Sequence, residues 1–183
     1  PYTDCHALFL ADGSYNSCRG NNPHRTCSAS CADRPPDVNN GQGGGTVVYP
    51  GNSNWRTGSG PAGTWETWIG RRGDVARALF LLDVRYEGGV HGGTGYAEPD
   101  LILTDDEALA EVWAVNAPEV YMGFLTPLLA WHQQDAVDAV EATRNEVVFS
   151  YQENRNPFID HPERVACLFL DLCPIFAHGL ESG

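Results

Sequence analysis

The chain has 183 residues, a formal net charge of −13 and 11 basic residues, all of which are arginines. This length is sufficient to bury a core, and no apolar run is long enough to span a bilayer, so we expect no membrane partner. The acidic balance argues against a tight duplex binder, because basic side chains that neutralise phosphates supply much of that affinity. It does not exclude an enzyme that meets nucleic acid through a local arginine cluster and a bound cation.

Taken in chain order, the first apolar run covers residues 7–11 and ends at an Asp-Gly turn signal. Its length and boundary predict a short buried strand or extended segment, followed by a short helical turn. Such an arrangement would hold the side chains of His6, Asn16 and Arg19 on one rigid support, which a metal and phosphate site requires.

Residues 21–63 are rich in Gly, Asn, Ser and Pro and predict a long irregular loop region with one short strand candidate at residues 46–49. The Gly-rich stretch at residues 39–45 precedes no helix, so we expect a surface loop in preference to a phosphate cradle. Trp55, Trp65 and Trp68 are expected to pack this region over the core, with stacking on nucleic-acid bases as the alternative.

Residues 74–86 predict a central buried helix, because Val75, Ala78 and Leu82 recur at helical spacing among further apolar residues. Asp74 and Arg77 lie three positions apart and can pair in its first turn. A Gly-rich break at residues 88–95 follows, and its single histidine is expected to be solvated.

Three later helices are predicted from their start signals. Residues 104–107, Thr-Asp-Asp-Glu, form a capping box for a helix that extends to about residue 115. Thr126 and Pro127 open a second helix, and Asp135 is expected to cap a third that continues to about residue 151. We expect an inward stripe on this third helix made of Val137, Val140, Val147, Val148 and Tyr151.

Arg144 falls on that stripe. An inward guanidinium needs a partner, so we expect a buried ion pair, with a phosphate ligand as the alternative. In residues 152–162, Asn154, Arg155 and Asn156 are suited to stapling turns by hydrogen bonds. Asp160 or His161 is expected to cap a final helix, whose core-facing side chains would be Val165, Cys167, Leu168 and Phe169.

Six cysteines in a lysine-free chain favour an oxidising compartment. Neighbours in sequence are the simplest disulfide partners, although the connectivity of six thiols cannot be deduced from sequence. The expected pairs are Cys27/Cys31, Cys167/Cys173 and, by remainder, Cys5/Cys18. A zinc site made of His24, Cys27 and Cys31 is the alternative, disfavoured because no second Cys/His pair has ligand spacing.

Three ordered blocks resemble the bacterial endonuclease I family of secreted and periplasmic nucleases. The first is Asp4-x-His6-x-Leu8 followed by Asp12-Gly13-x-x-Asn16-x-x-Arg19-x-Asn21. The others are residues 72–80 with Arg85-Tyr86-Glu87, and residues 131–135 with Arg144-Asn145 and residues 152–162, where Glu153 replaces the usual Gly. The blocks cover most of the chain, and their fixed order makes the resemblance specific.

The resemblance implies an α+β fold of the ββα-metal (His-Me finger) type, mainly helical here and with long irregular loops. It implies a metal-dependent, sequence-tolerant endonuclease that hydrolyses DNA or RNA. By resemblance, Asn16 would bind Mg²⁺ or Ca²⁺ through its side-chain oxygen, Arg19 would hold the phosphate, and His6 would orient the site. Arg144 and Arg155 would contribute further substrate binding.

In that family a Glu-His-Val-x-Pro segment, which carries the general-base His and a metal-holding Glu, lies before the Asp-x-His block. No such segment occurs in these residues. We therefore expect residues 1–183 to form a single endonuclease domain that lacks its N-terminal part and, taken alone, lacks the general base. The alternative function is a non-catalytic secreted protein that binds or supports other molecules on the nuclease scaffold.

Overall fold

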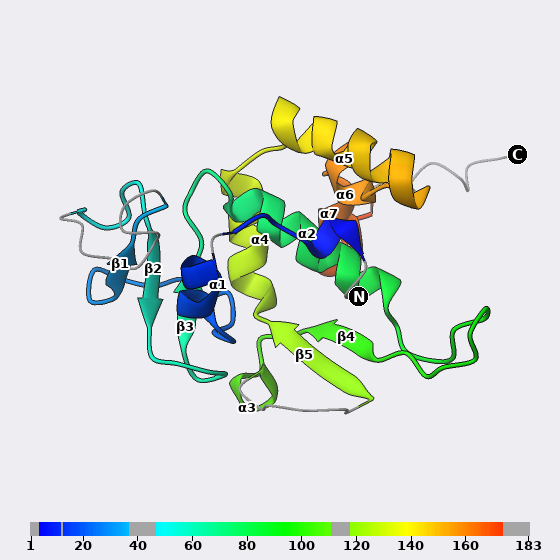
Figure 1. Cartoon of the computed structure of the whole chain (residues 1–183), viewed down its shortest axis with the longest axis horizontal. Helices are drawn as coiled ribbons and strands as arrows, with labels where there is room; N and C mark the ends of the chain where they lie inside the picture. The colour runs from blue at the N-terminus through cyan, green and yellow to red at the C-terminus, as the bar shows by residue number, and fades with distance from the viewer. Residues whose placement is uncertain (1–3, 12, 37–46, 111–117, 174–183) are drawn as a thin grey trace, which may run out of the picture. The chain divides into compact units, whose positions relative to one another are not determined.

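The computed structural model describes residues 4–11, 13–36, 47–110 and 118–173 (Figure 1). Helices account for 41% and strands for 15% of these residues, so the fold is mixed α+β and the expectation of a mainly helical chain was overstated. The chain divides into two compact units, Pro1–Ala136 and Val137–Gly183. Each unit is described by itself below, and the expected single domain stays a prediction.

The first unit is built around helix α2, Arg72–Arg85, which packs against α4, Leu125–Gln134 (Figure 1). Phe80 of α2 and Leu128 and Trp131 of α4 are almost completely buried between them. The predicted central helix and the predicted start of α4 near Thr126 are thus confirmed. The expected ion pair within α2 is present, with Arg77 Nη2 lying 3.6 Å from an Asp74 carboxylate oxygen.

A three-stranded antiparallel sheet replaces much of the irregular region that we expected between residues 21 and 63. Its strands β1 (Ala32–Arg34), β2 (Asn54–Thr57) and β3 (Thr64–Glu66) are ordered β1-β2-β3. Trp55 and Trp65 are buried, as predicted, and Trp68 is half-buried. Residues 47–49 do not form the expected strand, and residues 37–46 lie outside the described residues.

A second, parallel pair of strands consists of β4, Asp100–Leu103, and β5, Glu119–Gly123. Between them lies the short helix α3, Glu107–Ala110. The Thr104 hydroxyl accepts from the N–H of Asp106 at 3.1 Å, and the Glu107 carboxylate pairs with Arg25 at 2.9 Å. The expected reciprocal capping box was therefore wrong, and the predicted end near residue 115 lies outside the described residues.

The N-terminal segment begins with a 3-10 turn, η1 (Cys5–Ala7), because the Asp4 carboxylate accepts from the N–H of His6 at 3.0 Å. Residues 8–11 form no strand and Leu10 is fully exposed, so the buried-strand alternative was wrong, whereas the extended backbone at Leu8 fits the extended-segment alternative. The predicted short helix is confirmed as α1, Gly13–Arg19. Asp12 of the motif lies outside the described residues.

The second unit contains α5 (Ala139–Gln152), α6 (Pro157–Asp160) and α7 (Arg164–Leu170). Asp138 caps α5, whereas the predicted cap Asp135 follows α4 and accepts from the Gly73 N–H at 2.9 Å. The predicted inward stripe was wrong. Val148 is buried, but the other buried residues of α5 are Glu141 and Asn145, while Val140, Val147 and Tyr151 are exposed.

The turn after α5 is stapled by side chains, as predicted. The Asn145 amide accepts from the Asn156 N–H at 2.9 Å and donates to the Asn156 carbonyl at 3.3 Å. Arg155 donates twice to Asp160, each time at 2.7 Å. Glu153 adopts a left-handed conformation with φ 60°, so the backbone there is one that glycine favours.

The last predicted helix is observed as α7, but it begins after Glu163, and neither Asp160 nor His161 caps it. Asp160 closes α6, and His161 follows it. Val165 is buried as expected, whereas Leu168 is exposed, so only part of the predicted core face is confirmed. No helix in the described ranges is long and apolar enough to cross a bilayer.

Two of the expected disulfides are formed, Cys27–Cys31 and Cys167–Cys173. Cys18 is a free thiol and is not bonded to Cys5, so the third expected pair was wrong. The zinc alternative is also overturned, because Cys27 and Cys31 are consumed by their disulfide.

Candidate functional site

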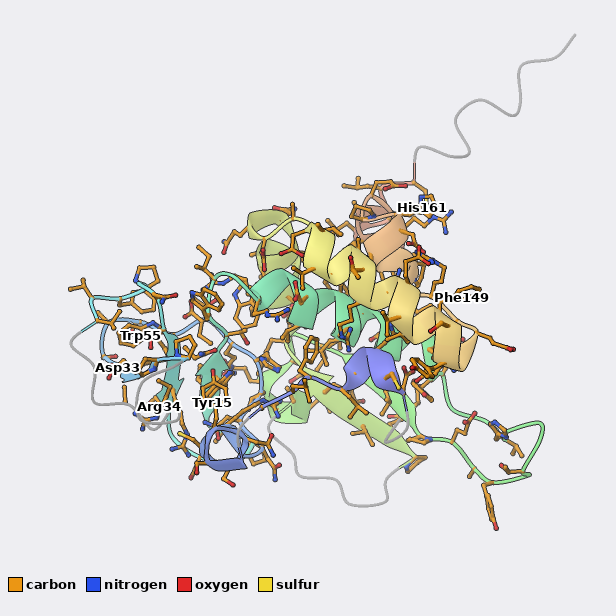
Figure 2. The ribbon with its side chains drawn as sticks, turned by 45° about the horizontal axis from the view of Figure 1, so that its top comes forward. Tyr15, Asp33, Arg34, Trp55, Phe149 and His161 are labelled. Carbon is orange, nitrogen blue, oxygen red and sulfur yellow. A yellow bond between two sulfur atoms is a disulfide. The ribbon has the colours of Figure 1, made fainter. Side chains whose placement is uncertain are left out.

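Helix α1 presents its inner side to the three-stranded sheet (Figures 1 and 2). Tyr15 packs edge-on against Trp65 of β3, with ring centroids 5.3 Å apart and an interplanar angle of 88°. Burial is also the main cause of the raised pKa of the Tyr15 hydroxyl. Arg19 lies four residues later, on the same inner side, because residues four apart share a helix face. The helix is therefore fixed to the sheet through this side.

Arg19 is anchored by a buried histidine that lies outside the helix. Its Nη2 lies 3.3 Å from Nε2 of His24, and Nδ1 of His24 lies 3.2 Å from the Thr67 hydroxyl. A guanidinium can only donate, so Nε2 of His24 must accept and its Nδ1 must carry the proton that is donated to Thr67. Both ring nitrogens are thereby engaged, which leaves His24 no atom for abstracting a proton from water.

The environment of His24 keeps its ring neutral. Only 7% of the residue is exposed, and burial together with the adjacent Arg19 charge holds the pKa of His24 well below its usual range. Burial also lowers the pKa of the Arg19 guanidinium. Because the buried ring is neutral, it provides the lone pair that accepts from Arg19.

Asn16 lies three positions before Arg19 and is exposed to solvent. Its carbonyl accepts from the N–H of Gly20 at 2.9 Å, where Gly20 has φ 57° and ends the helix. The side-chain amide thus offers one oxygen donor at the surface, a ligand type that Mg²⁺ and Ca²⁺ prefer. Among the described residues no group of three His, Cys, Asp or Glu side chains could hold a metal.

The other predicted site residues lie elsewhere. His6 is fully buried in η1, which packs against α2 (Figure 1). Arg144 is a half-buried residue of α5 in the second unit. Arg155, also in the second unit, pairs with Glu146 at 2.8 Å and with Asp160, and these contacts raise its pKa. The structure therefore brings together Asn16 and Arg19 but not His6 with them.

The comparison with protein families agrees with these motifs, since the endonuclease I family profile matches residues 1–163. The chain belongs to the endonuclease I family. The extracellular ribonuclease of Bacillus amyloliquefaciens is 43% identical over 164 residues, and that of Bacillus subtilis (strain 168) is 40% identical over 164 residues. These alignments cover 89% of this chain but 45% of each relative, so the chain spans less than half of their length. No solved structure matches the chain.

Within this endonuclease I chain, sequence reasoning missed the anchoring role of His24, which it considered only as a zinc ligand. It also missed Arg34 and Arg56, which lie on the strands next to α1. Nothing in the sequence around His24 indicates whether its ring binds Arg19 or a metal ion. The two arginines could be found only from the pairing of strands that are 3 and 4 residues long.

Proposed function

We propose that the protein is a secreted, divalent-metal-dependent endonuclease that hydrolyses RNA or DNA with little sequence preference. Membership of the endonuclease I family supports phosphodiester hydrolysis. The names of the two relatives support RNA as a substrate and secretion, and the two disulfides suit an oxidising environment. We assign the α+β fold to the ββα-metal class, with α1 as the helix of that motif.

The observation that carries this proposal is the two-sided character of α1. One side is fixed by the contacts of Tyr15 with Trp65 and of Arg19 with His24, while Asn16 faces solvent. Because the Asn16 amide is exposed, it contributes little to the packing that holds α1 in place. A side chain held at a fixed position and left open to solvent is instead suited to binding a ligand.

In this proposal, Asn16 would hold Mg²⁺ or Ca²⁺ through its side-chain oxygen, and such an ion would supply charge neutralisation at the scissile phosphate. Arg19 would hold a phosphate oxygen only through the remaining N–H groups of its Nη atoms, since Nη2 contacts His24, Nη1 donates to the Gly20 carbonyl at 3.4 Å and Nε is buried. We assign the general base to a histidine outside the α1 region, because both nitrogens of His24 are engaged. His6 keeps a positioning role through η1, and Arg144 remains the proposed phosphate ligand of the second unit.

Arg155 has a weaker claim to substrate binding. Its guanidinium is shared between Glu146 and Asp160 at distances of 2.7–2.8 Å. A phosphate would have to displace charge-assisted hydrogen bonds that already satisfy the side chain. We therefore propose that Arg155 mainly staples the second unit.

The test is cleavage of labelled RNA and of plasmid DNA by the complete protein with Mg²⁺ or Ca²⁺ and with chelator. Asn16→Ala should lower the rate by about 100-fold or more while leaving the melting temperature unchanged, because the amide serves the ion and not the core. Asn52→Ala, the same change at another exposed asparagine of the first unit, is the matched control and should retain activity.

A second function, binding without catalysis, is favoured by the net charge of −13, which opposes retention of polyanionic substrates. The same assay separates the two. If the complete protein cleaves neither RNA nor DNA with any divalent metal, the nuclease proposal fails and the scaffold has another use. A comparison of the two substrates also decides whether RNA is preferred.

A further inference from the structure

An open pocket of about 580 Å³ lies on the flank of α1 next to the face that carries Asn16. Helix α1 contributes Gly13, Ser14, Ser17 and Cys18 to its lining, and the sheet contributes Arg34 and Arg56. The lining thus consists of two guanidinium groups, small polar side chains and a thiol. Among the described residues no carboxylate lines this pocket, although the chain has 24 Asp and Glu residues in total.

The register of the sheet places the two arginines together. Arg34 of β1 is opposite Asn54 of β2, and Ala32 is opposite Arg56. Paired residues of an antiparallel sheet point to the same face, and so do residues two apart along one strand. Arg34 and Arg56 are therefore diagonal neighbours on one face. Trp65, which is paired with Arg56 and contacts Tyr15, shows that this is the face covered by α1.

Arg34 is held in place by neutral groups. Its Nε donates to Cys18 Sγ at 3.0 Å, and its Nη1 donates to the Asp33 carbonyl at 2.7 Å. Figure 2 shows Arg34 and Tyr15 in the same part of the first unit, on the sheet and on α1 respectively. These contacts fix the orientation of the guanidinium without neutralising its charge.

Arg56 is less satisfied than Arg34. Its Nε is buried and has no hydrogen-bond partner among the described residues. Within the same part of the chain, neither Arg34 nor Arg56 forms an ion pair with a carboxylate. Two like charges side by side are unfavourable, and leaving a buried donor without an acceptor is destabilising. A bound anion relieves both penalties at once.

We propose that this pocket is a phosphate subsite in which Arg34 and Arg56 hold a backbone phosphate of a nucleic-acid strand. The inference rests on the proposed nuclease function and adds a second point of attachment beside the scissile phosphate. Seven residues of α1 span about 10 Å, and Ser17 of the pocket directly follows Asn16. A strand whose scissile phosphate lies at Asn16 therefore passes a neighbouring phosphate over this pocket.

Cys18 provides a built-in reporter of occupancy, because its thiol lies in the pocket in contact with Arg34. The experiment measures the rate at which iodoacetamide alkylates Cys18 in the intact protein, followed by peptide mass analysis, in chelator so that no cleavage occurs. The rate is compared without ligand, with a short single-stranded oligonucleotide, with inorganic phosphate, and with chloride at matched ionic strength. Cys5, measured in the same samples, is the internal reference.

The oligonucleotide should slow alkylation of Cys18 several-fold in the wild-type protein, and chloride should not. In the doubly substituted variant, Arg34→Gln with Arg56→Gln, this protection should disappear while the melting temperature stays near that of wild type. Anisotropy titrations of the same oligonucleotide should show about tenfold weaker binding for this variant and a salt slope lowered by about 1 per arginine. Arg164→Gln, an equal charge change at an exposed arginine of α7, is the control and should bind like wild type.

The possible results separate this inference from the proposed function. If the wild-type protein cleaves nucleic acid but the oligonucleotide does not protect Cys18, the subsite is refuted and the nuclease proposal stands. Protection by inorganic phosphate alone would mean that the pocket takes a free anion and not a strand, which also refutes the inference. Protection by the oligonucleotide in a protein that cleaves nothing would retain the subsite and refute catalysis.

Discussion

Acidification should destabilise the first unit through His24. The ring is buried, and it accepts a hydrogen bond from Arg19, which cannot be maintained once Nε2 is protonated. Burial and the Arg19 charge accordingly hold the folded-state pKa of His24 well below 6.5. In the unfolded chain the pKa of the ring returns to about 6.5.

The sign and the size of the effect follow from this difference. Between the two pKa values the unfolded state binds more protons than the folded state, so the free energy of unfolding falls as the pH falls. Above about pH 6.5 the imidazole is neutral in both states and contributes no slope. Below that pH the loss approaches about 1.4 kcal/mol per pH unit, which gives at most about 2 kcal/mol between pH 6.5 and pH 5.

The assay is urea unfolding followed by tryptophan fluorescence at several pH values from 7.5 to 5. The Trp131 ring, whose centroid is 5.9 Å from that of His24, contributes to this signal together with the other tryptophans of the first unit. His24→Gln retains an amide oxygen for Arg19 but does not titrate, so its stability should fall less steeply with acid than that of wild type. Thr67→Ser keeps the hydroxyl partner and should preserve the wild-type slope. Parallel pH profiles of wild type and His24→Gln would refute the reasoning.

Three further substitutions test the packing by their effect on the free energy of unfolding in urea. Gly73→Ala should destabilise by about 1–3 kcal/mol despite the higher helix propensity of alanine, because the added Cβ would clash with the Asp135 carbonyl oxygen. Asn145→Ala should cost about 2–4 kcal/mol, since it removes the hydrogen bonds to Asn156 and leaves buried backbone groups without partners. Glu153→Gly should instead stabilise by about 1 kcal/mol, because φ there is 60°; a loss of stability would show that the glutamate side chain contributes more than the backbone strain costs.

The helices were predictable because their signals are local. The spacing of apolar residues in α2 and the Thr-Pro start of α4 lie within one or two turns, and both helices appear where the sequence placed them. The turn after α5 was likewise predicted, because Asn154, Arg155 and Asn156 have side chains that can hydrogen-bond nearby backbone groups. In these segments local preference and final structure agree.

The failures have a common cause, which is contact between residues far apart in sequence. Strands β1 to β3 have 3 or 4 residues each, too few for an alternating pattern, and they exist only through their mutual pairing. On α5 the apolar pattern selected the wrong face, because Asn145 is buried to bind Asn156 while Val147 is left exposed. A buried network in which every polar atom has a hydrogen-bond partner can stabilise the fold more than the burial of one valine side chain would.

The sequence motif identified candidate residues on α1, but not the residues that surround this helix in the fold. Asn16 and Arg19 were assigned from the family resemblance; both lie on α1, where a short helix was expected, and their roles stay a prediction. The grouping of His6 with them followed from proximity in sequence. The structure places His6 in η1 beside α2, because Asp4 turns the chain before the apolar run. What surrounds α1, namely His24, Arg34 and Arg56, comes from strands and loops that sequence spacing does not bring together.

The distribution of arginines explains how so acidic a chain can hold a polyanion at α1. Most arginines of the described residues are paired with carboxylates, and these are Arg25, Arg71, Arg72, Arg77, Arg85 and Arg155. Arg19, Arg34 and Arg56 instead contact an imidazole, a thiol or backbone carbonyls, or have an unsatisfied donor. Exposed charges farther away than about 10 Å are largely screened at 0.1 M ionic strength. A strand lying along α1 therefore meets the guanidinium groups of Arg34 and Arg56, which attract a phosphate locally although the net charge of −13 opposes binding at longer range.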